Sequence, residues 1–232
     1  MSSPGQFSTP AVVYDAGADL GLGCGLPTQF AAITEGNVVL DLGSGAGNDV
    51  FVARSLVGDS GKVIGVDMTE AMIAQAQQNL AKLGYKNIEF RLGDIESLPV
   101  KDNEIDVVVS NCVLNLVPNK TKAFQEIYRV LKPGGHFCIS DIVLRGELPE
   151  KLKSLAELYA GCVAGALQYD EYLHAIREAG FVDLEIHKDH QYIVPNATLA
   201  QYLNQEDIQI YRQSNAGVFS ITASARKPSR TE

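Results

Sequence analysis

Short apolar runs separated by amphipathic stretches form the pattern of residues 38–141. Residues 69–83 and 120–131 carry apolar side chains at helical spacing, and the sequence Lys-Pro-Gly-Gly after Leu131 ends the second helix. The apolar runs are short and rich in branched residues, which is typical of buried strands. They are residues 38–42, 62–66, 88–92, 105–110 and 135–141. The alternation predicts an α/β fold with a mostly parallel sheet and helices on both faces.

The last third of the chain has a different pattern. Residues 182–194 and 217–227 alternate as strands do, which predicts an antiparallel edge and a total of seven strands. Residues 147–180 are expected to be a mainly helical cover over the site, and residues 196–214 a helix with a loop. We expect one domain over residues 31–232, with residues 1–30 as an arm that covers the site.

Polar residues follow the apolar runs at the points where the predicted strands end. The first run is followed by glycines at alternate positions, which let the backbone turn tightly and approach a ligand. The second run ends in Asp67, at the offset where an acid can accept hydrogen bonds from a ribose. The carboxyl ends of parallel strands bind ligands in open α/β sheets. This edge carries Asp41, Gly43, Gly45, Gly47, Asp67, Asp94 and Asn111. Each Asp could instead cap a helix, but four polar strand ends in order favour a ligand site.

The glycine spacing and the acidic edge narrow the choice of ligand. Asn48 stands where a dinucleotide fold more often has its third glycine, and no Gly-Lys-Ser/Thr follows the turn. An acidic edge suits a cationic ligand better than a pyrophosphate. In these features the chain resembles the Rossmann-like S-adenosylmethionine-dependent methyltransferases of class I. The resemblance implies S-adenosylmethionine as cofactor, with the glycine turn on its methionine part, Asp67 on the ribose and Asp94-Ile95 beside the adenine. The implied cofactor-binding set is Asp41, Gly43, Ser44, Gly45, Asp67, Met68, Asp94, Ile95 and Asn111.

Charge and hydropathy exclude several partners. The formal net charge of −9 argues against a nucleic-acid substrate, whose phosphates such a surface would repel. No apolar run is long enough to span a bilayer, and residues 1–10 lack the pattern of a secretion signal. We therefore expect a cytoplasmic protein without a membrane partner, in which the four cysteines are thiols.

Three of the four cysteines fall at informative places. Cys24 lies in a glycine-rich loop of the arm, Cys112 directly follows Asn111, and Cys162 lies in a stretch of small residues. Cys138 sits in the middle of a predicted strand and is interpreted as a core residue. The wide spacing makes a zinc-ribbon site improbable. Packing would be the default role for each of the other three as well, but Cys112 is next to the expected methyl donor.

The sequences around these cysteines resemble the three cysteine motifs of arsenite methyltransferases. The motifs are Gly-Cys-Gly-Leu-Pro at 23–27, Ser-Asn-Cys-Val-Leu-Asn at 110–115 and Gly-Cys-Val-Ala-Gly-Ala at 161–166. The resemblance implies that Cys24, Cys112 and Cys162 are catalytic and bind one trivalent arsenic atom, which is soft and thiophilic. It further implies arsenite as substrate and a cellular thiol as reductant. Many members have a further N-terminal cysteine linked to product reduction. Residues 1–23 have none, which is compatible with arsenic binding and with slow or absent later methylations.

Two other functions stay open at this stage. The chain could methylate carbon or oxygen of a small organic acceptor, as relatives in quinone biosynthesis do, in a pocket lined by tyrosines such as Tyr159, Tyr169 and Tyr172. It could also bind cofactor or metalloid without catalysis. The four histidines, none of which is near a cysteine motif, are interpreted as structural or surface residues.

Overall fold

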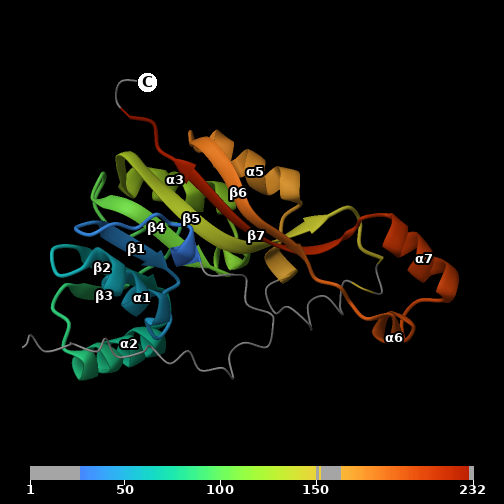
Figure 1. Cartoon of the computed structure of the whole chain (residues 1–232), viewed down its shortest axis with the longest axis horizontal. Helices are drawn as coiled ribbons and strands as arrows, with labels where there is room; N and C mark the ends of the chain where they lie inside the picture. Colours follow the sequence, from blue (N-terminus) through green and yellow to red (C-terminus); the bar gives the residue numbers. More distant parts are fainter. Residues whose placement is uncertain (1–26, 150–151, 153–162, 230–232) are drawn as a thin grey trace, which may run out of the picture.

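The computed structural model describes residues 27–149, 152 and 163–229. Within these residues, seven strands form one sheet in the order β3-β2-β1-β4-β5-β7-β6 (Figure 1). The strands are β1 Val38–Leu42, β2 Lys62–Asp67, β3 Ile88–Leu92, β4 Ile105–Asn111, β5 Leu131–Arg145, β6 Val182–Gln191 and β7 Gly217–Arg226. Strands β1 to β5 pair in parallel, whereas β7 runs antiparallel to both of its neighbours, β5 and β6. The predicted seven-stranded, mostly parallel sheet is confirmed.

Strand β5 is much longer than the predicted residues 135–141. Helix α3 ends at Val130, one residue before the predicted end, and the strand begins at once with Leu131. The register then shifts: Ile105 pairs with Leu131 and Val107 with His136, so residues 132–135 form an irregular excursion. Proline and glycine favour such an excursion, because proline has no amide to donate to the ladder. At its other end β5 continues to Arg145, which pairs with Gly217 of β7.

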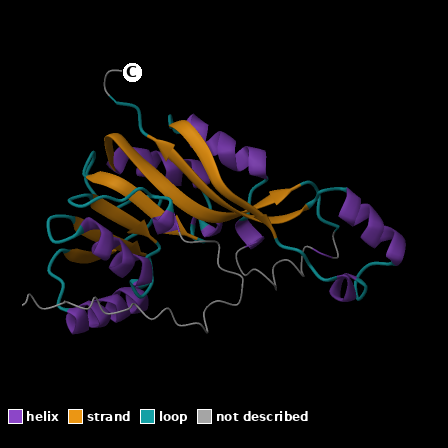
Figure 2. Ribbon diagram, viewed as in Figure 1, coloured by secondary structure: helices purple, strands orange, loops and turns teal. Residues whose placement is uncertain are grey.

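Helices cover both faces of the sheet (Figures 1 and 2). Helices α1 (Asn48–Val57) and α2 (Glu70–Leu83) pack on one face around Val39, Val63 and Val107. Helices α3 (Lys120–Val130) and α5 (Tyr169–Glu178) pack on the other face, in a larger core with Phe124 and Phe137. Side chains on the two faces of the sheet therefore belong to two separate apolar layers, as expected for a parallel sheet that is buried on both sides.

The connections differ in part from the sequence-based expectations. Residues 196–214 form two helices, α6 (Asn196–Leu199) and α7 (Gln205–Gln213), instead of one. Of residues 147–180, Glu147, Leu148 and Pro149 are not helical, and α5 is the main helix described there. Three short 3₁₀ helices are present in the described chain: η1 (Pro27–Gln29), η2 (Leu114–Leu116) and η3 (Val163–Gly165). The described helices include none with the length and apolarity that a bilayer crossing needs.

A third apolar cluster lies beyond the parallel part of the sheet. It joins the carboxyl end of β5 and the amino end of β7 to α6 and α7, at the right of Figure 1. Ile142, Val163 and Val218 belong to this cluster, and the side chain of Cys112 packs against it. The cluster therefore extends the fold to the carboxyl end of β4, where the predicted site lies.

Candidate functional site

The glycine turn between β1 and α1 is held against β2. The backbone amides of Gly43 and Ser44 both donate to the carbonyl of Val66, at 2.8 and 3.0 Å. Gly43 has φ +68°, and a Cβ there would lie 2.4 Å from a methyl carbon of Val113. Gly45 has φ +51°, and no heavy atom lies within 4 Å of the position its Cβ would take. The turn is thus tightly packed at Gly43 and open at Gly45, where a ligand can approach the backbone.

Asp67, the last residue of β2, is fixed by two backbone amides. One carboxylate oxygen accepts from Gly45 and the other from Thr69, both at 2.9 Å. A carboxylate oxygen can accept more than one hydrogen bond, so Asp67 keeps acceptor capacity for a hydroxyl. The side chain is thereby oriented before any ligand arrives.

A pocket of about 510 Å³ opens beside Asp67. Five of its lining residues belong to the predicted cofactor set: Gly43, Asp67, Met68, Asp94 and Ile95. A second wall of the pocket is largely apolar and comes from the segment after Cys112. The sequence alone does not assign this segment to the cofactor site, because no local pattern marks it. That wall consists of Val113, Leu116, Val117 and Pro118. Apolar walls with a few fixed polar groups are typical of small-molecule sites.

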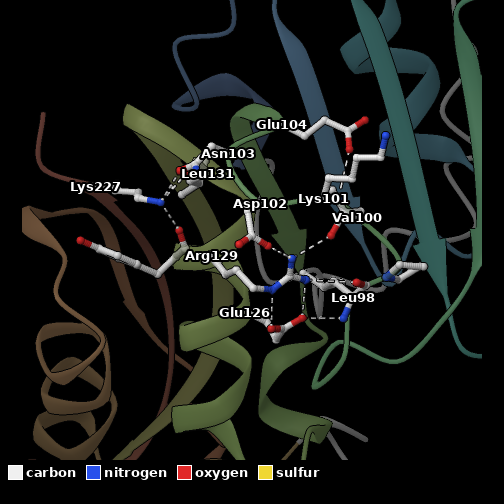
Figure 3. A network of polar contacts seen from close by, with 12 residues as sticks. Leu98, Val100, Lys101, Asp102, Asn103, Glu104, Glu126, Arg129, Leu131 and Lys227 are labelled. Carbon is white, nitrogen blue, oxygen red and sulfur yellow. Dashed lines mark hydrogen bonds and ion pairs between the residues drawn. The ribbon is translucent and has the colours of Figure 1, made fainter. Parts of the chain in front are cut away.

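The segment that carries Asp94 is tied to helix α3. The amide of Glu96 donates to the Asp94 carboxylate at 2.8 Å, and the Glu96 side chain accepts from the amide of Asn119 at 3.0 Å. Farther along, Arg129 donates to the carbonyls of Val100 and Leu98 and pairs with Glu126 (Figure 3). This network holds the continuation of the pocket wall in place.

A second group of acidic residues lies behind the glycine turn. Asp41 is almost fully buried, and burial raises the pKa of its carboxyl well above the ordinary range, with Asp49 and Asp67 adding to the rise. Burial also raises the pKa of Asp49, which accepts a 3.5 Å hydrogen bond from Asn111. Asp49 was not predicted, because acids in the first turn of a helix are common and only the contact with Asn111 singles this one out.

These residues fit a cationic cofactor. Neighbouring carboxylates raise one another's pKa, and a positive group between them would relieve that repulsion. The hydroxyl of Ser44 is buried and has no hydrogen-bond partner within the described residues, so it is available to a ligand. Together with the open face of Gly45, the set suits the amino acid and sulfonium parts of S-adenosylmethionine better than a phosphate.

Cys112 lies at this edge, as predicted. It directly follows Asn111 at the end of β4, and its amide donates to the carbonyl of Ser140 at 2.8 Å. Its φ of +56° is in the left-handed region, which non-glycine residues rarely adopt. Residues with such strained backbone angles cluster at functional sites. Cys112 is disulfide-bonded in this structure, so the expectation of thiols is wrong for this residue. Cys24 and Cys162 lie outside the described residues, whereas Cys138 is a free, buried core cysteine, as predicted.

The turn after Cys112 contacts the segment that follows Cys162. A Cβ on Gly165 would lie 2.0 Å from the carbonyl oxygen of Asn115, so η3 rests directly on η2. Val163 and Ala166 pack in the same apolar cluster as Cys112. The described residues that follow Cys112 and Cys162 within their motifs are therefore neighbours in space.

Of the three tyrosines suggested for an organic acceptor, the two that the structure describes do not line the pocket. Tyr172 is buried and donates to Asp141 at 3.1 Å. Tyr169 packs under the guanidinium of Arg145, with 4.1 Å from the ring centroid to Cζ. Tyr159 lies outside the described residues.

Comparison with known proteins places these features in a family. Residues 33–180 match the family described as a methyltransferase domain. The arsenite methyltransferase of Halobacterium salinarum is 46% identical over 216 residues, which are 93% of this chain and 53% of that protein. The crystal structure of an arsenic(III) S-adenosylmethionine methyltransferase from Chlamydomonas reinhardtii is similar, with a TM-score of 0.74 and 36% identity over 89% of this chain and 68% of that one.

The sequence similarity to quinone-biosynthesis methyltransferases covers less of the chain. A ubiquinone/menaquinone biosynthesis C-methyltransferase of Hydrogenovibrio crunogenus is 38% identical over 112 residues, or 48% of this chain. The chain spans about half the length of the curated arsenite methyltransferases that it matches.

Proposed function

Because the chain belongs to the S-adenosylmethionine-dependent methyltransferases, within the group of the arsenite methyltransferases, we propose that it methylates trivalent arsenic. The observation that carries this proposal is the position of Cys112, directly after the strand that ends in Asn111 and before the apolar wall of the pocket. A soft thiolate at that position can present arsenic to a methyl donor.

The cofactor-binding residues would divide the work by their chemistry. When bound, S-adenosylmethionine supplies an electrophilic methyl carbon on a sulfonium that is already an activated leaving group. Asp67 would accept from the ribose hydroxyls, and Asp94 with Ile95 would hold the adenine. Ser44 and the open backbone at Gly45 would hold the amino acid part. Asp41 and Asn111 complete this set. Asp49 is an added acid, and its negative charge would favour a cationic cofactor.

Cys24, Cys112 and Cys162 would hold arsenic as three thiolates and leave its lone pair free. With S-adenosylmethionine bound, its sulfonium would supply the methyl carbon for an arsenic–carbon bond and would keep the electron pair of the broken carbon–sulfur bond as a neutral thioether. Proximity and alignment supply much of the rate, and no proton has to be removed. The contact between η2 and η3 supports a common location for Cys112 and Cys162.

A thiol reductant belongs to this proposal because Cys112 is disulfide-bonded. Two thiols of the reductant are oxidised to a disulfide while Cys112 and its partner sulfur become thiols. Only then can Cys112 bind arsenic as a thiolate.

The arm of residues 1–30 is proposed to cover the site and to supply Cys24. Its described end supports this. His136 makes a 2.7 Å hydrogen bond with the carbonyl of Ala31, and the ring of Phe30 stacks on His187 with 5.2 Å between centroids. These contacts anchor the chain six and seven residues after Cys24 to the sheet. A covered site would exclude water from the arsenic adduct.

Incubation of the reduced protein with arsenite, S-adenosylmethionine and a thiol tests the proposal. We expect methylated arsenic species by chromatography, and loss of turnover in Cys112→Ser with cofactor binding preserved. Cys138→Ala is the matched control, since this buried core cysteine does not line the pocket, and it should keep turnover. Full activity of Cys112→Ser, or cofactor binding without any methylated arsenic, would overturn the proposal. Methylation of a quinone-like acceptor instead would favour the organic alternative.

A further inference from the structure

A buried polar cluster lies directly beneath the turn that follows Cys112. Its centre is Asp141 of β5, which is fully buried. One carboxylate oxygen of Asp141 accepts from the hydroxyl of Tyr172, and the other accepts from the amide of Ile142, both at 3.1 Å. The backbone amide of Asn115 lies close enough to this carboxylate to lower the pKa of the Asp141 carboxyl. Asp141 therefore holds η2 from its amide side.

Lys120 holds the same turn from its carbonyl side. Its ammonium group donates to the carbonyl of Asn115 at 3.1 Å and to the carbonyl of Val117 at 3.0 Å. The side chain of Lys120 is buried although it stands in the first turn of α3. A buried ammonium is costly unless it is hydrogen-bonded or paired, and here the carbonyls and the charge of Asp141 compensate.

The turn η2, which Asp141 and Lys120 contact, lies between the two parts of the proposed site, Cys112 and the cofactor pocket. Cys112 precedes it, and its amide is bonded to Ser140, the neighbour of Asp141. Leu116 and Val117, at its other end, line the cofactor pocket. Gly165, from the segment after Cys162, rests on the carbonyl of Asn115. A displacement of η2 would therefore move a sulfur ligand relative to the pocket wall.

We propose that Asp141 and Lys120 are positioning residues for methyl transfer, which hold the peptide at Asn115 from both sides and so align Cys112 with the pocket. This inference rests on the proposed function for its effect on turnover. It adds two residues that touch neither cofactor nor arsenic, but that set the geometry between them. A misplacement of the order of 1 Å at a reacting centre can cost about 100-fold in rate.

The test compares Asp141→Asn, Lys120→Met and the double variant with Lys122→Met. Lys122 stands on the same helix with an exposed side chain, so its variant is the matched control. The readouts are kcat and KM for arsenite methylation, the dissociation constant for S-adenosylmethionine by calorimetry, and the alkylation rate of Cys112 in the reduced protein, followed by peptide mass spectrometry. Thermal melting reports folding.

We expect each single variant to lower kcat about tenfold or more, with the cofactor dissociation constant changed by less than about threefold. The alkylation rate of Cys112 should change at least about threefold in both. The double variant should lose no more than about threefold beyond the worse single variant, because both residues act on one peptide. Lys122→Met should match the native protein in every readout.

An unchanged kcat and an unchanged alkylation rate in Asp141→Asn and Lys120→Met, even with lower melting temperatures, would overturn the inference and leave a merely structural cluster. If Asp141→Asn does not fold, Lys120→Met and Tyr172→Phe decide by the same criteria. If the native protein binds cofactor but does not methylate arsenite, the proposed function fails by itself. The alkylation rate of Cys112 then still decides the positioning: a changed rate supports it and an unchanged rate overturns it.

Discussion

Asp67 and Gly45 are joined by a 2.9 Å hydrogen bond from the glycine amide to the carboxylate, across 22 positions of sequence. The bond links the acid at the end of β2 to the turn at the end of β1. The two parts of the expected cofactor site are therefore held in register by the protein alone, which reduces the ordering that a ligand has to pay for on binding.

Substitution of Asp67 by alanine should weaken cofactor binding strongly. The variant loses the expected ribose acceptor and also frees the amide of Gly45. Hydrogen bonds to charged groups contribute about 1.5–3 kcal/mol, so we expect the dissociation constant for S-adenosylmethionine to rise at least about tenfold in calorimetry. Asp59→Ala is the control, because Asp59 is 99% exposed after α1 and its surface pair with Arg54 contributes little. Equal affinity in the two variants would contradict the assignment of Asp67.

Gly45 and Gly84 form a matched pair for a test of the turn. Both have positive φ, +51° and +71°, and no heavy atom lies within 4 Å of the position of an added Cβ at either. Alanine should therefore cost about 1–2 kcal/mol of stability at each site through backbone strain. Only Gly45→Ala should also weaken S-adenosylmethionine binding, because its Cβ would enter the ligand space. Thermal melting and calorimetry of the two variants would show this, and equal cofactor affinities would be evidence against a close approach at Gly45.

Gly165→Ala should separate η3 from η2. The added Cβ would meet the carbonyl oxygen of Asn115 at 2.0 Å, and neither atom belongs to a flexible side chain. We expect a loss of about 1–3 kcal/mol in the free energy of unfolding, as for other overpacked sites, and a marked fall in arsenite methylation. Denaturant unfolding and the turnover assay measure the two effects. A variant with native stability and native turnover would show that the contact has no role.

The stability of the protein should depend on pH through Asp141. Burial raises the pKa of this carboxyl to about 7, although hydrogen bonds from Tyr172 and two amides and the charge of Lys120 oppose the rise. The folded state thus binds the proton more tightly than the unfolded chain, so this group removes stability as the pH rises from about 4 to about 7.

Asparagine at position 141 does not titrate. The melting temperature of Asp141→Asn, measured relative to the native protein, should therefore increase between about pH 5 and about pH 8, by several degrees at this chain length. A constant or falling difference over that range would contradict a raised pKa for Asp141.

The sequence alone predicts the parallel half of the fold because each strand there is a short apolar run that ends in a polar residue. Asp67 and Asn111 end their strands as expected, and Asp94 follows closely after β3. These residues are visible in sequence because a sheet brings the carboxyl ends of its parallel strands to one edge.

The unpredicted features depend on contacts between distant segments. Only the contact with Asn111 distinguishes Asp49, since acidic residues in the first turn of a helix are common. The contacts of Lys120 and Asp141 with Asn115 connect α3 and β5 to η2. No local sequence pattern predicts that a lysine is buried. The extension of β5 likewise depends on its pairing with β7.

The place of β7 between β5 and β6 matters during synthesis on the ribosome. Strand β6 emerges before β7, so it leaves the exit tunnel without the neighbour that it will later pair with. The edge of β5 is also unpaired until β7 is made. Unpaired strand edges promote aggregation and are bound by chaperones. Strand β6 contains two irregular register positions and charged residues such as Asp183 and Lys188, which disfavour premature pairing with other nascent chains.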